Sequence, residues 1–66
     1  MRIKTVVRRS ATLEKCVDTL TEKMVNYVTP ELRKDPAFKD ALREGRLAAL
    51  HLKHLGEKFD ALRQAA

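Results

Sequence analysis

Two runs of apolar residues at heptad spacing, separated by a short segment that contains both prolines, constrain the fold of this chain more than any other feature. The first run alternates steps of three and four residues, and only one member is polar: Ile3, Val6, Ser10, Leu13, Val17, Leu20, Met24 and Tyr27. The second run follows the same rule: Phe38, Ala41, Gly45, Ala48, Leu52, Leu55, Phe59, Leu62 and Ala66. This spacing indicates two amphipathic helices.

The segment between the runs predicts where the helices end. A proline disfavours helical geometry at the residue before it and lacks the amide that an interior helix position needs. Pro30 and Pro36 each follow a residue type that caps helices, Thr29 and Asp35, so each proline is expected at a first helical position. A single turn over 31–34 is expected between them. The predicted bounds are a helix over about 3–28, a connection over 29–35 and a helix over about 36–64.

Folding the chain back about the middle of this connection aligns the two runs in one register. Leu20 then faces Gly45, so that a large side chain meets a small one, and Ser10 faces Leu55. The loop position and the two heptad phases agree with each other. The sequence therefore predicts an all-α fold, in which residues 1–66 form one antiparallel helical hairpin.

Such a hairpin has little apolar surface to bury. Chains below about 70 to 80 residues rarely form a sufficient core without a disulfide, a metal or a partner chain. Cys16 is the only cysteine, so no disulfide can form within the chain. Apolar side chains outside the predicted seam are expected to form a second apolar surface: Val7, Val25, Val28, Leu42, Leu47, Ala49 and Leu50. These features predict a homodimeric four-helix bundle with coiled-coil packing.

The first ten residues allow a different interpretation. They are rich in β-branched residues and partly alternate in polarity, so Arg2, Lys4 and Arg8 would project from one side of a strand. Ser10 would then cap a shorter first helix. The order strand, helix, helix resembles the ribbon-helix-helix family of DNA-binding proteins. That resemblance implies a dimeric repressor whose paired strands, over residues 2–8, contact the major groove. The Gly-containing turn between short helices that this family has is missing here.

No arrangement of residues in the sequence indicates catalysis. A Gly-rich phosphate loop, a nucleophile elbow and the Cys/His spacing of a structural zinc site are all missing, so we expect neither enzymatic activity nor a cofactor. His51 and His54 lie three residues apart. Because no carboxylate or cysteine stands at ligand spacing beside them, we expect them to flank the seam without binding a metal. Cys16 is expected to be a half-buried structural residue.

The charge distribution points to an anionic partner. The chain has 14 Lys and Arg residues against 9 Asp and Glu, a net charge of +5. The first 13 residues hold four cations and no acid: Arg2, Lys4, Arg8 and Arg9. Three cations recur every seven residues on the second expected helix, with a fourth beside them: Lys39, Arg46, Lys53 and Arg43. These eight are the candidate phosphate-contacting residues. A solvated face that keeps a small helical protein soluble would explain the same pattern.

Charge and architecture together favour a small basic protein that binds nucleic acid, with phosphate attraction and counterion release supplying most of the affinity. The chain has two Phe, one Tyr and no Trp, and none is clearly available for stacking on bases. A duplex of RNA or DNA is therefore favoured over single strands. The architecture resembles that of RNA-binding plasmid regulators and viral suppressors of RNA silencing, although no sequence motif is shared with either.

A protein-interaction module, such as an inhibitor, adaptor or chaperone, is the alternative. Leu47 and Leu50 are expected on the outward side of the second helix, near Arg43 and Arg46. Exposed leucine beside arginine is typical of protein-binding surfaces, and burial in the homodimer is a third explanation. The sequence contains no secretion leader and no apolar run long enough to cross a membrane, so we expect a cytoplasmic protein with no membrane contact.

Overall fold

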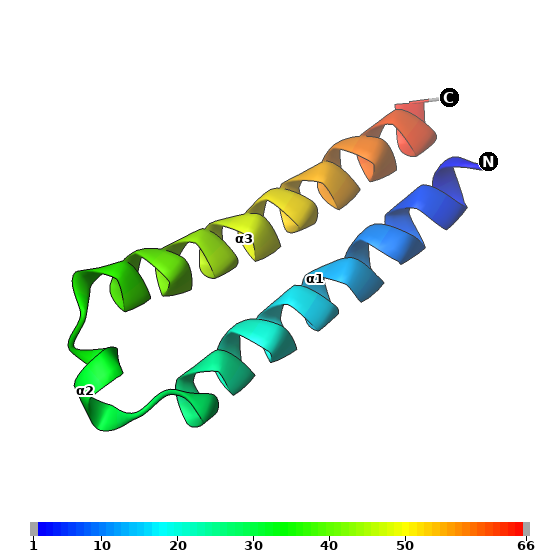
Figure 1. Cartoon of the computed structure of the whole chain (residues 1–66). Coiled ribbons are helices and arrows are strands. Elements are labelled where there is room, and N and C mark those ends of the chain that lie inside the picture. Colours follow the sequence, from blue (N-terminus) through cyan, green and yellow to red (C-terminus); the bar gives the residue numbers. More distant parts are fainter. Residues whose placement is uncertain (1, 66) are drawn as a thin grey trace.

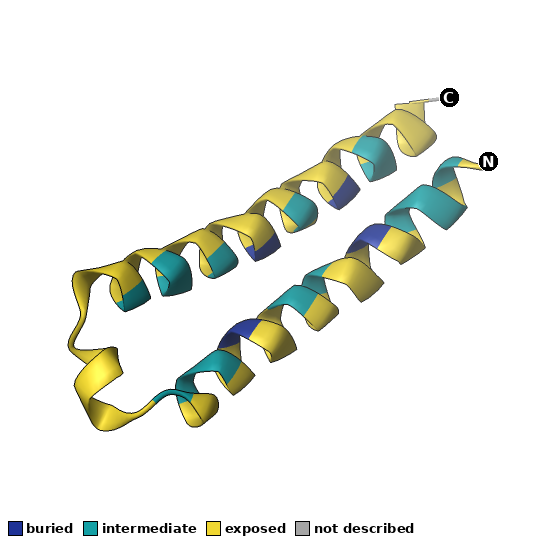
Figure 2. Ribbon diagram, in the orientation of Figure 1, coloured by how far each residue is buried: buried dark blue, intermediate teal, exposed yellow. Residues whose placement is uncertain are grey.

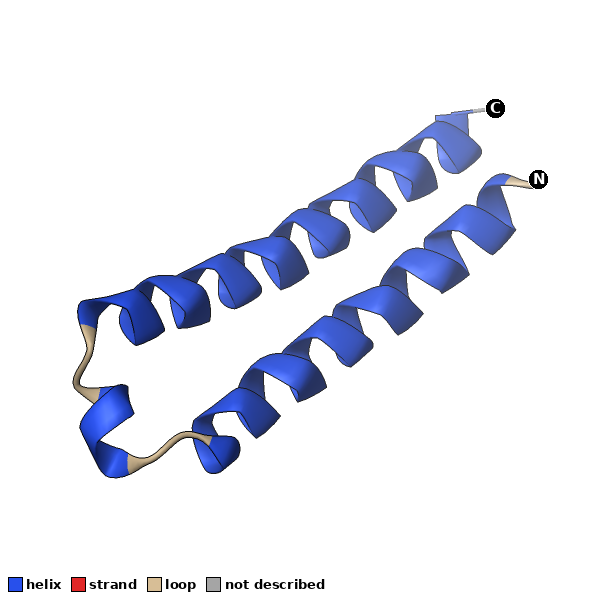
Figure 3. Cartoon of the chain, in the orientation of Figure 1, coloured by secondary structure: helices blue, strands red, loops and turns tan. Residues whose placement is uncertain are grey.

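The computed structural model describes residues 2–65, which form two long helices and one short helix (Figures 1 and 3). Helix α1 spans Ile3–Tyr27, the single-turn helix α2 spans Pro30–Arg33, and α3 spans Pro36–Ala65. Helices α1 and α3 run antiparallel, and the start of α1 lies beside the end of α3 (Figure 1). The predicted all-α hairpin is confirmed, and it forms a rod of 52 × 16 × 13 Å. Met1 and Ala66, a predicted member of the second heptad run, lie outside the described residues.

The observed helix ends agree with the predicted ones because both capping residues act as expected. Thr29 Oγ1 accepts a hydrogen bond from the backbone N–H of Leu32 at 3.4 Å and caps α2. Asp35 Oδ1 accepts a hydrogen bond from the backbone N–H of Ala37 at 2.8 Å at the start of α3. These bonds satisfy amides that have no partner within their own helix.

The strand interpretation of the first residues is wrong. Helix α1 begins at Ile3, so residues 2–8 cannot form the paired ribbon of a ribbon-helix-helix protein. The β-branched side chains that suggested a strand are used for packing between helices. Val7 lies beside Leu52 and Gly56 of α3 and is partly buried. Packing against α3 therefore overrides the local preference for a strand.

The buried and partly buried positions of α1 and α3 lie on the sides of the two helices that face each other, which form the seam (Figure 2). The buried residues of the described chain are all small: Ser10, Thr21, Ala49 and Gly56. Ser10 Oγ donates a hydrogen bond to the carbonyl oxygen of Val6 at 2.9 Å, and Thr21 Oγ1 donates one to that of Val17 at 2.8 Å. Because each hydroxyl is satisfied within its own helix, it can be buried without an unpaired donor.

The register differs by one residue from the predicted one. Gly45 lies against Thr21 and not against Leu20, and Ser10 lies against Gly56 and not against Leu55. The predicted leucines are rotated out of the seam, and each is replaced by the smaller residue that follows it. Helix backbones approach closely only where side chains are small, so this rotation brings the two helices together along Ser10, Thr21 and the glycines.

The second apolar surface predicted outside the seam is also wrong for most of its members. Ala49 is buried, and four others are partly buried at the edges of the seam: Val7, Val25, Val28 and Leu42. Of the predicted set, only Leu47 and Leu50 are exposed. A partial rotation of both helices, which keeps Ser10 and Gly45 in the seam, places these side chains further inward and the predicted seam leucines further outward.

The rotation leaves one broad apolar face uncovered. On α1, Leu13, Leu20 and Tyr27 are 52%, 62% and 83% exposed. On α3, Leu55 and Leu62 are 43% and 57% exposed. Four of them directly precede a buried or partly buried residue, and Leu62 follows Leu55 at heptad spacing. Because the two helices run in opposite directions, the position before a seam residue points to the same side of the hairpin on both. We call these five residues the open apolar face.

Candidate nucleic-acid interface

The register gathers charge at one end of the rod. The contact between Ser10 and Gly56 places residues 2–10 level with residues 56–64, and we call these two segments the open end (Figure 1). The open end holds six cations and two acids, which is an excess of four out of the chain's net charge of +5. The remainder of the chain has eight cations and seven acids. The six cations of the open end are Arg2, Lys4, Arg8, Arg9, Lys58 and Arg63.

The structure therefore brings the predicted N-terminal cluster together with cations that sequence reasoning missed. Lys58 is exposed and lies level with Arg8, one on each long helix. Lys58 is isolated in the sequence among apolar and acidic neighbours, so the adjacent residues do not mark it as a phosphate-contacting residue. The predicted antiparallel register is the available signal, since it already places residue 58 beside the start of the first helix.

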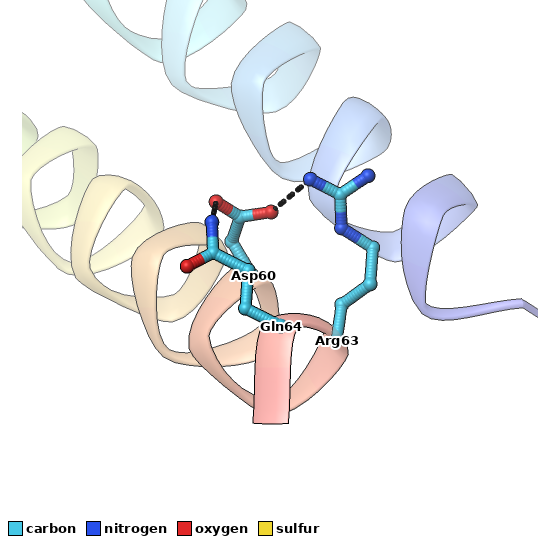
Figure 4. A network of polar contacts seen from close by, with 3 residues as sticks. All are labelled: Asp60, Arg63 and Gln64. Atoms are coloured by element: carbon cyan, nitrogen blue, oxygen red, sulfur yellow. Dashed lines mark hydrogen bonds and ion pairs between the residues drawn. The ribbon is translucent and has the colours of Figure 1, made fainter. Parts of the chain in front are cut away.

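One acid of the open end is already paired (Figure 4). Asp60 Oδ1 lies 2.6 Å from Arg63 Nη2, and Asp60 Oδ2 accepts a hydrogen bond from Gln64 Nε2 at 3.3 Å. The charges of Asp60 and Arg63 offset one another. Within the open end, Glu57 is the acid that then opposes the other five cations. Arg8 also shares a shallow depression with Glu14 and Asp18 of α1.

The four cations predicted on the second helix are exposed, but acids lie close to three of them. Arg43 forms an ion pair with Asp40 at 3.4 Å. Arg46 shares a shallow depression with Asp18 and Glu22 of α1. These carboxylates offset much of the positive field over the part of α3 that lies towards α2.

Lys53 lies in a shallow groove between the two helices. Glu14 of α1 and Glu57 and Asp60 of α3 line the same groove. Lys39 borders a different depression, together with Arg43. The cationic stripe, defined as Lys39, Arg43, Arg46 and Lys53, therefore exists on the surface, although α1 supplies acids beside two of its four members.

The two predicted partner-binding leucines lie within the same surface as part of this stripe. Leu47 and Leu50 are exposed, and together with Leu42 they line the depression that Lys39, Arg43 and Arg46 border. This depression is on the outer side of α3, away from the open apolar face. The structure thus joins the predicted protein-binding residues to part of the predicted phosphate-binding set.

The remaining candidate residues show no arrangement for chemistry. His51 and His54 are exposed, and residues 2–65 contain no group of three or more His, Cys, Asp or Glu that could hold a metal ion. Cys16 is exposed and not half-buried as predicted, because it precedes the seam residue Val17 on the outward side of α1. Within the described helices, no segment is long and apolar enough to cross a membrane.

Comparison of the chain with models of protein families, with curated proteins and with solved structures finds no match in any of the three. The function is therefore inferred from the surface of the hairpin.

Proposed function

We propose that this chain is a small basic protein that binds the phosphate backbone of duplex nucleic acid as a homodimer, without catalysing a reaction. The concentration of charge at the open end carries the proposal, since four of the five excess positive charges lie there. A local cationic excess attracts polyphosphate over the range of a Debye length, and release of condensed counterions supplies affinity that does not depend on sequence.

The homodimer is supported by the surface that one hairpin leaves uncovered. Ala49 is the only hydrophobic side chain among residues 2–65 that is buried. One buried alanine and a set of partly buried side chains form too small a core to offset the conformational entropy of about 64 ordered residues. A second copy would bring an identical set of leucines to the open apolar face, in an interface that is the same on both partners.

The cations of the open end stay accessible in the proposed dimer. All six are exposed in the hairpin. Arg9 stands four residues before Leu13 and Lys58 four before Leu62, so both border the open apolar face, and long cationic side chains extend from such a border to solvent.

Tyr27, the most exposed of the three aromatic residues, belongs to the face that the second copy covers, while Phe38 and Phe59 are partly buried. No aromatic side chain then remains for stacking on bases, which favours a duplex over a single strand.

The proposal is tested by fluorescence anisotropy with labelled duplex RNA, duplex DNA and the corresponding single strands, between about 50 and 200 mM salt. We expect both duplexes to bind more tightly than single strands, with affinity that falls steeply as salt rises. The absence of binding to every duplex at the lowest salt would refute the proposed function.

A protein-interaction module is the second candidate, and one observation favours it. Leu42, Leu47 and Leu50 form a shallow apolar depression with a cationic border, and the proposed dimer leaves this depression open. An apolar depression with arginines at its border fits an acidic, leucine-containing helix. If no nucleic acid binds, Leu47 and Leu50 become the residues to replace.

A further inference from the structure

We infer that phosphate is contacted by the open end of the hairpin and not by the cationic stripe of α3, and that Lys58 belongs to the contact surface. This inference rests on the proposed function and names the part of the molecule that performs it. It departs from the sequence prediction in two ways, because it adds Lys58 to the surface and removes the four residues of the stripe from it: Lys39, Arg43, Arg46 and Lys53.

The charges of the open end are free to act on a ligand. Within residues 2–65, the ion pairs are those of Arg43 with Asp40 and of Arg63 with Asp60. Arg8, Arg9 and Lys58 therefore form no ion pair within the described chain, and all three side chains are exposed. The stripe differs in that Arg43 is paired with Asp40. Arg46 and Lys53 lie beside acids of α1, as Arg8 does at the open end.

The extent of each surface also favours the open end. At about 1.5 Å per residue, the nine-residue segments of the open end extend about 13 Å along the rod, whereas the stripe from Lys39 to Lys53 extends about 21 Å. The Debye length at physiological salt is about 8 Å. A phosphate near the open end therefore feels most of its cations together, while a phosphate near the stripe feels one or two of them and the acids beside them.

Solubility alone does not account for the arrangement. Charges that served only solubility would be expected to spread over the whole surface, because like charges at close range repel one another. Here the chain outside the open end is nearly neutral, with eight cations and seven acids. The open end, in contrast, keeps Arg8 and Arg9 adjacent on one helix with Lys58 level on the other.

The test compares two triple variants with the same change in net charge. The first, Arg8→Gln with Arg9→Gln and Lys58→Gln, removes cations of the open end. Its matched control, Lys39→Gln with Arg43→Gln and Arg46→Gln, removes cations of the stripe. All six side chains are exposed, so both proteins are expected to keep the helicity and the sedimentation behaviour of the parent.

We expect the open-end variant to bind duplex DNA and duplex RNA at least about tenfold more weakly than the parent near physiological salt. Its plot of log affinity against log salt should become shallower by about 0.9 for each phosphate that the variant no longer neutralises on B-form DNA. The stripe variant should bind less than about threefold more weakly, with a nearly unchanged slope. Lys58→Gln alone should reduce affinity for both duplexes by a similar factor, because a cation that binds phosphate reads no base.

The possible outcomes separate the inference from the function on which it rests. An equal or greater reduction of affinity in the stripe variant overturns the inference while leaving nucleic-acid binding intact. An unchanged affinity in Lys58→Gln removes Lys58 from the surface. A parent protein that binds no duplex refutes the proposed function itself. If the open-end triple variant loses helicity, Arg9→Gln and Lys58→Gln are compared singly with Arg46→Gln and Lys39→Gln.

Discussion

Gly45 of α3 lies directly against Thr21 of α1. A β-carbon added to Gly45 would stand 3.2 Å from Thr21 Cβ and closer still to the hydroxyl oxygen. That hydroxyl is held in place, since it donates a hydrogen bond to the carbonyl oxygen of Val17 at 2.8 Å. The absence of a side chain at position 45 therefore sets how closely α1 and α3 approach near the middle of the rod.

Replacing Gly45 with leucine is expected to destabilise the protein by about 1 to 3 kcal/mol, because the new side chain must displace Thr21 or separate the helices. Chemical denaturation followed by circular dichroism measures the change. A smaller side chain gives the control, since Gly45→Ala should cost less than Gly45→Leu and should be partly rescued by Thr21→Ala. A Gly45→Leu protein as stable as the parent would show that the two residues are not in contact.

Gly56 is expected to respond in the opposite direction. A β-carbon added there would stand 3.4 Å from Ser10 Cβ, which is an ordinary van der Waals contact. Alanine is favoured over glycine inside a helix by about 1 kcal/mol. Gly56→Ala should therefore raise the free energy of unfolding by up to about 1 kcal/mol, while Gly45→Ala lowers it. Parallel denaturation curves of the two variants test this difference in sign.

The helix ends were predictable because they depend on local chemistry. Thr29 and Asp35 cap the helices that follow them, and both prolines occupy first helical positions. These preferences act over three or four residues and need no knowledge of the remaining fold. The antiparallel pairing was predictable for a related reason, because a short connection between two long helices leaves few other arrangements.

The seam was only partly predictable. Ranking residues by hydrophobicity places Leu20 and Leu55 in the seam, and the structure places Thr21 and Gly56 there. Two helix backbones approach closely only where the residues between them are small. Threonine can be buried there because its hydroxyl donates a hydrogen bond to a carbonyl of its own helix. One hairpin also lacks the second layer of helices that would cover the leucines. The predicted heptads describe positions that a bundle buries, and a single hairpin buries only part of them.

The candidate site was predictable for the N-terminal cations alone. Arg8 and Arg9 stand out because they are adjacent in the sequence without a nearby acid. Lys58 joins them only through the register, and Arg46 is opposed by Asp18 only through the same register. A charge count along one helix cannot detect either effect, because both depend on the residues that the other helix places alongside.

The open apolar face provides a prediction about assembly. Leu13→Gln with Leu20→Gln places two polar side chains at the centre of the proposed dimer interface. We expect this variant to be monomeric at micromolar concentration and to lose helicity, because a single hairpin has too small a core. Sedimentation equilibrium measures the mass, and circular dichroism measures the helicity. In the parent protein, the thermal midpoint should rise with protein concentration.

The control for this variant changes two exposed leucines elsewhere. Leu47→Gln with Leu50→Gln makes the same chemical change on the outer side of α3, away from the open apolar face. It should remain dimeric with a nearly unchanged thermal midpoint. If the second pair dissociates the protein and the first does not, the two copies meet through the outer side of α3 and the proposed interface is incorrect.

The start of α1 provides a prediction in which stability and binding change in opposite directions. Arg2 occupies the N-cap position of α1, but its side chain makes no capping hydrogen bond. The first turn of α1 contains no acidic residue and includes Lys4. A cation there opposes the positive end of the helix dipole. Lys4→Glu should therefore stabilise the protein by about 0.3 to 1 kcal/mol at low salt.

The same change should weaken binding to every duplex, because Lys4 belongs to the open end. Lys4→Gln should fall between Lys4→Glu and the parent in both denaturation and anisotropy measurements. A Lys4→Glu protein that binds duplexes as tightly as the parent would place the contact surface away from this turn.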